Sequence, residues 1–156
     1  MKKKIFSILF ALVLVLSFSL AMAGPVAAVG KAAPKVTGDV WFTTTDGYPR
    51  HVWFVAQEAY AGRPVKGEFH QEDWCGGSYH YYNGYVTAAD IGINYANFAT
   101  YIYDGSGLVG QTLYLHVHDG GEPGIGVDTV DGGFSSDYTT YTGNWAIYEG
   151  NLVVHN

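Results

Sequence analysis

Residues 111–118, Gln-Thr-Leu-Tyr-Leu-His-Val-His, decide the fold, because aliphatic side chains alternate with polar or aromatic ones along them. Successive side chains of a β-strand point to opposite faces of its sheet. The alternation therefore predicts a strand with one buried aliphatic face and one outer face. The aliphatic set is Leu113, Leu115 and Val117, and the other set is Thr112, Tyr114, His116 and His118.

The same kind of pattern extends outward over the chain from residue 36. Apolar runs of five to nine residues are separated by clusters of Gly, Asp and Asn, and no window has a sustained helical period. This pattern is typical of an all-β protein, and its short connections favour antiparallel neighbours. We expect a single antiparallel β-sandwich or small β-barrel of about eight or nine strands, with strand 36–43 close to strand 151–155. The predicted strands are 36–43, 50–57, 66–72, 78–87, 91–103, 111–118, 141–148 and 151–155.

Three segments are harder to assign. Residues 51–56 are apolar on both alternating faces, which predicts a central strand covered on both sides. Residues 66–72 alternate acids and a histidine with Phe69 and Gln71, which predicts an edge strand or a strand with a solvated face. Residues 120–133 contain six glycines and three acids, and we expect a long loop or a loop with a short strand.

The amino terminus is typical of an exported protein. Three lysines precede an apolar run, and Ala21-Met22-Ala23 fits the rule for signal-peptide cleavage. We interpret residues 1–23 as a signal peptide, 24–35 as a small-residue linker and 36–156 as a secreted β domain, with no membrane span in the mature chain. Cleavage would remove three of the eight basic residues and leave all 14 acids, giving a formal charge of −9. A chain this acidic is not expected to bind nucleic acid.

Three motifs carry a family resemblance. They are Val36-Thr37-Gly38 followed by Trp41, the loop 119–124 leading to Asp128-Thr129, and the ending 150–155, Gly-Asn-Leu-Val-Val-His. This arrangement resembles an uncharacterised family of secreted β domains with a VTGxGW-like start, a DNGEPG…DT loop and a GGNIxVH-like end. Such domains occur alone after a signal peptide or at the tail of choice-of-anchor-type surface proteins. The resemblance implies a β fold and a secreted or cell-surface location, and it implies no activity.

Aromatic residues crowd one predicted hairpin. Tyr79, Tyr81 and Tyr85 share parity and should line one face, with Trp74 nearby and further tyrosines on the next strand. Such a face can be a sheet surface stabilised by cross-strand aromatic pairs. It can also be a platform on which sugar rings stack. The candidate ligand-binding residues are Trp74, Tyr79, Tyr81 and Tyr85, and the candidate partners are glycans or other cell-surface components.

Two groups of residues could hold a metal ion. Asp119, Glu122, Asp128 and Asp131 lie among glycines, and their hard oxygen ligands would suit a structural calcium ion. The same acids also fit ordinary turn chemistry, in which a carboxylate accepts hydrogen bonds from backbone amides.

The second group is His116, His118 and Glu122, whose spacing is close to the first cupin motif. A cupin would need both histidines inside its barrel, whereas the aliphatic set of this strand suggests that they point away from the core.

Other candidates are weaker. Glu68, Glu72 and Asp73 could be paired carboxylates for sugar hydrolysis. Alternating acids on a strand, however, usually form a solvent-exposed face. Cys75 has no partner within the chain for a disulfide. No nucleophile elbow, zinc-protease motif or phosphate loop is present. We therefore expect no catalytic residues and a non-enzymatic binding or structural role; the alternatives are a cupin-like metal-dependent enzyme and a self-assembling envelope or matrix component.

Overall fold

The computed structural model describes residues 32–134 and 143–156, which form a closed, antiparallel eight-stranded β-barrel. Each strand pairs with its neighbours in the sequence, and β8 returns to pair with β1. The described residues contain no helix. The all-β prediction is confirmed, and closure of the sheet decides in favour of a barrel. The strands are β1 (Lys35–Thr43), β2 (Pro49–Gln57), β3 (Lys66–Cys75), β4 (Ser78–Ile91), β5 (Tyr95–Gly105), β6 (Thr112–His118), β7 (Thr129–Gly133) and β8 (Trp145–His155).

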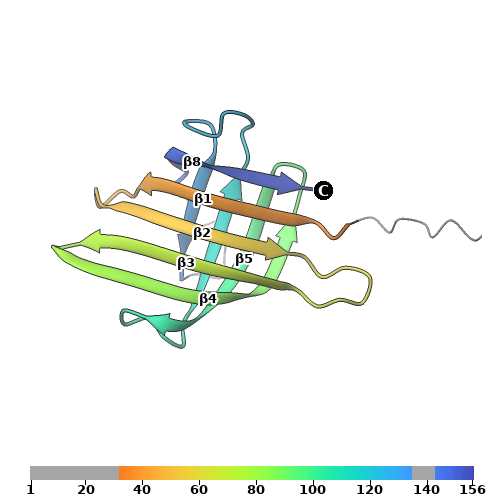
Figure 1. Cartoon of the computed structure of the whole chain (residues 1–156), viewed down its shortest axis with the longest axis horizontal. Helices are drawn as coiled ribbons and strands as arrows, with labels where there is room; N and C mark the ends of the chain where they lie inside the picture. Colours follow the sequence, from red (N-terminus) through yellow and green to blue (C-terminus); the bar gives the residue numbers. More distant parts are fainter. Residues whose placement is uncertain (1–31, 135–142) are drawn as a thin grey trace, which may run out of the picture. The chain divides into compact units, whose positions relative to one another are not determined.

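The first and last strands close the barrel, as the sequence predicted. Lys35 pairs with His155, and the ladder continues to Phe42 opposite Ile147 with one irregularity after Trp41. Figure 1 shows β8 lying beside β1. This pairing leaves neither β1 nor β8 as a free sheet edge, the feature through which strands of separate chains usually associate.

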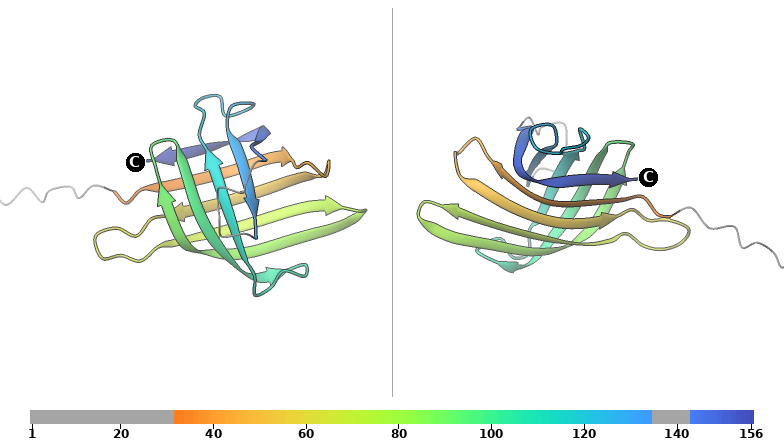
Figure 2. Two further views of the ribbon diagram at one scale, coloured as in Figure 1. Left: turned by 180° about the vertical axis from the view of Figure 1, so that it is seen from behind. Right: turned by 45° about the horizontal axis from the view of Figure 1, so that its top comes forward.

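The strands form two layers that cross each other. Strands β1 to β4 run side by side in Figure 1, and β5, β6 and β7 pass behind them at a steep angle. The reverse view in Figure 2 shows the same crossing from behind. This arrangement packs the inner faces of the two layers against each other, and the outer face of each layer meets solvent.

The core follows from the alternation along each strand. On β1 the buried residues are Val36, Val40 and Phe42, and on β2 they are Val52, Phe54 and Ala56. From the opposite layer, Phe98 brings its ring to 5.0 Å from the ring of Phe54, measured between centroids. The aliphatic set of β6 also points inward, since Leu115 and Val117 are buried.

Two strands differ from their predicted environments. Strand β2 is covered on one side only, because Trp53 lies on the outer face and is 37% exposed. Apolar residues on its outer face led to the wrong prediction of burial on both sides. Strand β3 pairs with β2 and with β4, so it is not an edge strand, but its predicted solvated face is confirmed by the exposed Glu68.

The carboxyl-terminal segments also differ from prediction. The break expected between 141–148 and 151–155 does not exist, because β8 runs without interruption over Trp145–His155. Gly150 has a φ of +94° within this strand, and a Cβ atom there would lie 1.9 Å from the carbonyl oxygen of Asp39. Glycine is thus required for close approach to β1 and does not mark a turn. The loop after β6 does contain a short strand, β7, at its end.

Some predictions lie outside the described residues. These are the signal peptide 1–23, the linker up to residue 31 and the first two residues of the predicted strand 141–148. The part of the linker that is described, residues 32–34, has no regular structure. Within the described part of the chain there is no apolar helix of the length needed to cross a bilayer.

The barrel interior should reject a side chain at Gly38. This glycine lies opposite Phe54 on the inner face, and an added Cβ would lie 2.5 Å from the Phe54 ring. Phe54 is fully buried against Phe98 and cannot move aside. We expect Gly38→Val to lower the free energy of unfolding by about 1–3 kcal/mol, the usual cost of overpacking. Urea denaturation measures this, with Thr37→Val on the outer face of the same strand as the control; equal stability of the two variants would contradict this packing.

Candidate functional site

The most developed surface feature is a group of aromatic rings on the outer side of β3, β4 and β5. Their positions alternate with buried residues, so the strands themselves direct the rings to solvent. Trp74 is 59% exposed, Tyr79 44%, Tyr85 48% and Tyr103 56%. We call this group the aromatic face, and its members are Trp74, Tyr79, Tyr81, Tyr85, Tyr101 and Tyr103.

The rings of the aromatic face contact one another in two sets. In the first set, Tyr79 lies between Trp74 and Tyr81, with centroid distances of 5.3 and 6.3 Å. In the second set, Tyr85 lies 5.4 Å from Tyr101 and 6.2 Å from Tyr103. Two of these pairs are close to parallel, at 24° for Tyr79 with Tyr81 and 18° for Tyr85 with Tyr103. Mutual packing therefore holds each ring in place while its exposed part stays open to solvent.

A chain of polar side chains runs between the two sets of rings. Both nitrogens of the His70 ring face acceptor oxygens, with Nδ1 2.6 Å from Asn83 Oδ1 and Nε2 3.0 Å from Glu72 Oε1. Asn83 in turn donates its amide to Asp104 over 3.1 Å. Glu72 also forms a hydrogen bond with Tyr79, which connects the polar chain to the first set of rings. Hydrogen-bonding groups are thus fixed beside stacking surfaces.

The protonation of this polar chain follows from its contacts. Burial lowers the pKa of His70, but its hydrogen bonds to Asn83 and Glu72 and the charge of Glu72 outweigh burial, so the pKa is raised overall. The pKa of Glu72 is lowered, first by its hydrogen bond to His70 and then by the one to Tyr79. The two shifts favour an ionised Glu72 beside a protonated His70.

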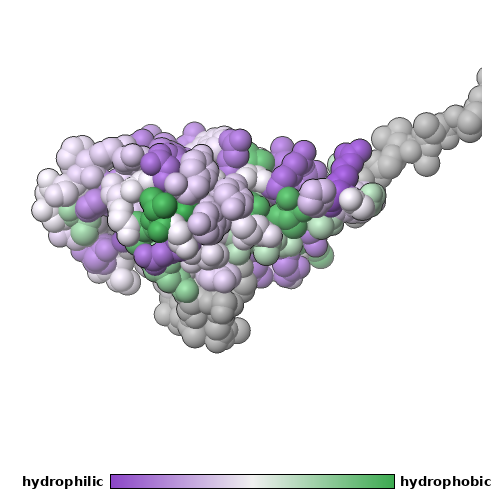
Figure 3. Space-filling model, turned by 90° about the horizontal axis from the view of Figure 1, so that it is seen from below, coloured by the Kyte–Doolittle hydropathy of each residue, from purple (hydrophilic) through white to green (hydrophobic). Residues whose placement is uncertain are grey.

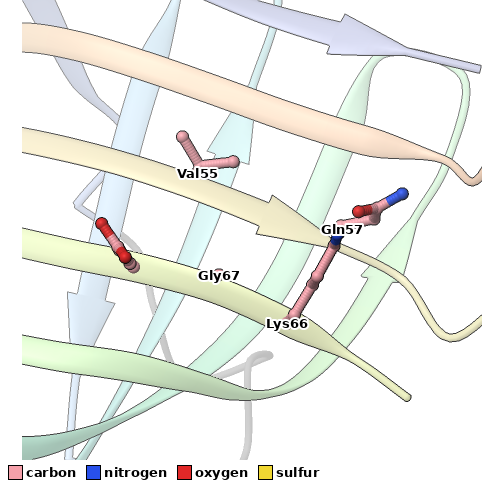
Figure 4. A pocket seen from close by; sticks show the side chains of 5 residues that line it. Val55, Gln57, Lys66 and Gly67 are labelled. Atoms are coloured by element: carbon pink, nitrogen blue, oxygen red, sulfur yellow. The ribbon is translucent and has the colours of Figure 1, made fainter. Parts of the chain in front are cut away.

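The outer face continues over β1 and β2 with a second aromatic group. Two hollows of about 440 and 250 Å³ share Val55 in their lining, and the exposed Trp53 lines the smaller one. In the larger hollow, Figure 4 shows the Lys66 side chain extending toward Gln57 from the neighbouring strand. The smaller hollow includes Asp39, whose carboxylate lies 2.7 Å from His51 Nε2. The His51 ring stacks on Trp41 at 4.6 Å and 8°, so this end of the face also combines rings with polar groups.

One side of the barrel has a mixed surface. Figure 3 views the barrel from below and shows mainly hydrophilic and intermediate residues, with hydrophobic ones in small separate clusters. Obligate protein interfaces are more continuously hydrophobic than this. A mixed surface with fixed rings is better suited to a hydrated ligand.

The sequence predicted part of the aromatic face correctly. Tyr79, Tyr81 and Tyr85 do lie on one side of the barrel, as their spacing indicated, and Trp74 contacts Tyr79 there. Tyr101 and Tyr103 join them because β5 pairs with β4, and Tyr101 is directly opposite Tyr85. Sequence reasoning noted tyrosines on this strand but could not give the register that brings them to Tyr85.

The three acids considered for sugar hydrolysis are divided between two faces. Glu68 and Glu72 lie on the outer side of β3, whereas Asp73 is buried in the interior. The alternation of the strand separates them. The structure therefore does not assemble this carboxylate group into one site.

The loop acids bind backbone amides. Asp128 is fully buried and accepts hydrogen bonds from the amides of Gly120 and Leu152. Asp119 accepts hydrogen bonds from the amides of Gly121 and Val154. Both acids thus fasten the loop after β6 to strand β8.

The other two loop acids point to different partners. Glu122 accepts a hydrogen bond from the Asn151 side chain, and Asp131 accepts from the amides of Gly132 and Gly143. Among the described residues, no three His, Cys, Asp or Glu side chains are grouped so that they could hold one metal ion. The hydrogen bonds of these four acids thus fit turn chemistry, and the structural calcium ion stays a prediction.

His116 and His118 lie on the outer face of β6, as the aliphatic inner set predicted. Nδ1 of His116 lies 2.6 Å from Asn97 Oδ1, and Nε2 of His118 lies 2.9 Å from Asn94 Nδ2. Burial lowers the pKa of His116, and the nearby charge of Asp131 offsets this only in part. Glu122 does not join them, because its carboxylate is held at Asn151. The structure therefore does not bring His116, His118 and Glu122 together inside the barrel.

Comparison with protein-family models, curated proteins and solved structures gives no match to this chain. Its function is therefore inferred from the geometry of its own residues.

The buried Asp128 predicts a specific pH dependence of stability. Burial raises its pKa above the ordinary 3.8, and the charges of Asp119 and Glu122 add to this, while its two backbone hydrogen bonds oppose it. An acid whose pKa is raised by folding stabilises the folded state. This stabilisation is fully present at pH values below the unfolded-state pKa of 3.8, and it is lost as the pH rises through the folded-state pKa. In Asp128→Asn this contribution is absent. We expect the stability of the wild type relative to the variant to fall as the pH rises from 3 to 7.

Chemical denaturation of both proteins at several pH values measures this difference. Any cost of the amide in the variant is independent of pH, so only the change in the difference matters. A constant difference, or a wild type that gains relative stability as the pH rises, would contradict a raised pKa at Asp128.

Proposed function

We propose that the protein is an exported, non-enzymatic β-barrel domain that binds uncharged glycans through its aromatic face. The observation that carries this proposal is the pair of nearly parallel tyrosine contacts, Tyr79 with the half-buried Tyr81 and Tyr85 with Tyr103, in which the other three rings are exposed. Sugar rings present apolar C–H faces that pack on aromatic rings. Two such sets on one side of a barrel suit a ligand with more than one sugar.

The polar chain supplies the second half of sugar recognition. Sugar hydroxyls need both donors and acceptors beside the stacking surface. Glu72, Asn83 and Asp104 provide carboxylate and amide oxygens between the two sets of rings. Asn83 is hydrogen-bonded to Asp104, and His70 connects Asn83 to Glu72. These bonds hold the groups in position before the ligand arrives, which reduces the entropy lost on binding.

The charge of the outer face supports an uncharged ligand. Four acids lie on the outer side of β1 to β5: Asp39, Glu68, Glu72 and Asp104. On the same side, Lys66 lines one of the hollows. Carboxylates repel uronic acids and sulfated sugars, and like charges brought together across an interface cost several kcal/mol. Export rests on the predicted signal peptide and on the resemblance to secreted β domains.

A glycan array of neutral and acidic oligosaccharides tests this proposal. We expect binding to neutral glycans, followed by a loss of affinity in Tyr79→Ala and in Tyr85→Ala. A lost stacking contact is worth about 0.5–1.5 kcal/mol, so each variant should bind roughly two- to twelvefold more weakly. Isothermal titration calorimetry measures the affinities.

Tyr148→Ala is the matched control, because Tyr148 is 47% exposed, like Tyr85, but belongs to β8. Its affinity should equal that of the wild type. Absence of binding to any glycan would overturn the proposal, and so would a preference for acidic glycans or equal losses in all three variants.

A further inference from the structure

A second candidate binding site lies inside the barrel, at the end where β3 and β7 finish and β2, β4 and β6 begin. It is a pocket of about 300 Å³. Its polar wall comes from the inner faces of β2, β3 and β4, where Arg50 is directly opposite Asp73 and Asp73 is directly opposite His80. We call it the barrel-end pocket, and its polar wall consists of Arg50, Gln71, Asp73, Cys75, His80 and Tyr82.

The charges of this wall are already balanced. Asp73 is buried, and its two carboxylate oxygens lie 3.0 Å from the Gln71 amide nitrogen and 3.1 Å from His80 Nδ1. The guanidinium of Arg50 forms an ion pair with Asp46 at 3.0 Å. A charged ligand would therefore enter without a free counter-charge, which makes its desolvation costly. The wall favours an uncharged occupant.

Several hydrogen-bonding groups remain for a ligand. Nε of Arg50 is buried and has no hydrogen-bond partner among the described residues. His80 also lines the pocket. Its Nδ1 is hydrogen-bonded to Asp73, so its other ring nitrogen, Nε2, is the one that a ligand could use. Tyr82 adds a hydroxyl to the same wall. A buried donor without a partner is costly, so a ligand oxygen that accepts from Arg50 would recover that cost.

The opposite wall is apolar. Leu108, Leu113 and Phe134 line it, and two glycines of β7 leave room beside them. A molecule that fits must therefore have hydroxyl or ether oxygens on one side and an apolar face on the other. A single sugar ring has this form, and the volume of the pocket is at the small end of ligand sites.

We propose that the barrel-end pocket binds one uncharged sugar ring or a polyol of similar size. This site is separate from the aromatic face, since neighbouring residues of a strand point to opposite sides of it. Tyr81 lies in the aromatic face and Tyr82 lies in the pocket. The two proposals can therefore fail independently.

Cys75 provides a built-in reporter of occupancy, because it lines the pocket and is the chain's single cysteine. The test measures the rate at which iodoacetamide alkylates Cys75 in the full protein, with and without glucose, galactose, mannose, N-acetylglucosamine or myo-inositol. We expect at least one of these probes to slow alkylation in a saturable manner. Acetate and pyruvate, tested at the same concentrations, should give no protection.

Paired variants assign the effect to the pocket. Tyr82→Phe removes one neutral hydrogen bond, which should raise the half-protecting concentration roughly two- to twelvefold. Tyr81→Phe is the matched control on the outer face and should leave this concentration unchanged. Arg50→Lys keeps the positive charge near Asp46 but lacks Nε, so it provides a second weakened variant if Tyr82→Phe does not fold.

Three results would overturn the proposal. They are no protection by any of the five probes, stronger protection by the anions, and equal weakening in Tyr81→Phe and Tyr82→Phe. Neutral-glycan binding that depends on Tyr85 would survive each of these results, because that residue lies on the outer surface.

Discussion

The structure depends on the pairing of β1 with β8, which closes the sheet. This ladder joins Lys35 with His155 and continues to the other end of both strands. Once the sheet is closed, each strand has an inner and an outer face, and the period of two assigns every residue to one of them. The inner faces form the core around Phe54 and Phe98. The outer faces are then free to carry rings and charged groups that contribute little to the core.

The hairpin of β3 and β4 shows how this constraint produces two different surfaces from one short sequence. Trp74 and Tyr79 face outward and contact each other, whereas Cys75 and His80, one residue further along, line the barrel-end pocket. The aromatic face and the polar wall of the pocket are both built on paired strands and not on loops. Sites held by regular strands keep their geometry without a ligand, and this supports recognition of a rigid ring. The loop after β6 has another role, since Asp128 fastens it to β8.

The local alternation of apolar and polar residues was sufficient to predict the fold class and most strands. It failed where the structural role of a residue depends on a partner far away in the sequence. Alternation correctly placed Leu115 and Val117 inside the barrel and Tyr79, Tyr81 and Tyr85 outside. It could not show that Gly150 continues a strand, because that depends on the approach of Asp39 from β1. Trp53 looked buried because it is apolar, but its face meets solvent. The register that brings Tyr101 to Tyr85, and Arg50 to Asp73, is likewise set by pairing between strands.

The central claim is that neutral glycans bind across the outer aromatic rings of β3, β4 and β5. An NMR titration of ¹⁵N-labelled protein with a neutral oligosaccharide that binds on the array tests it most directly. The account predicts that the largest shifts occur at the indole N–H of Trp74 and at the backbone amides of residues 79–85 and 101–104, with small changes in the loop 119–128. The largest shifts in that loop, or around His116 and His118 on β6, would contradict the account.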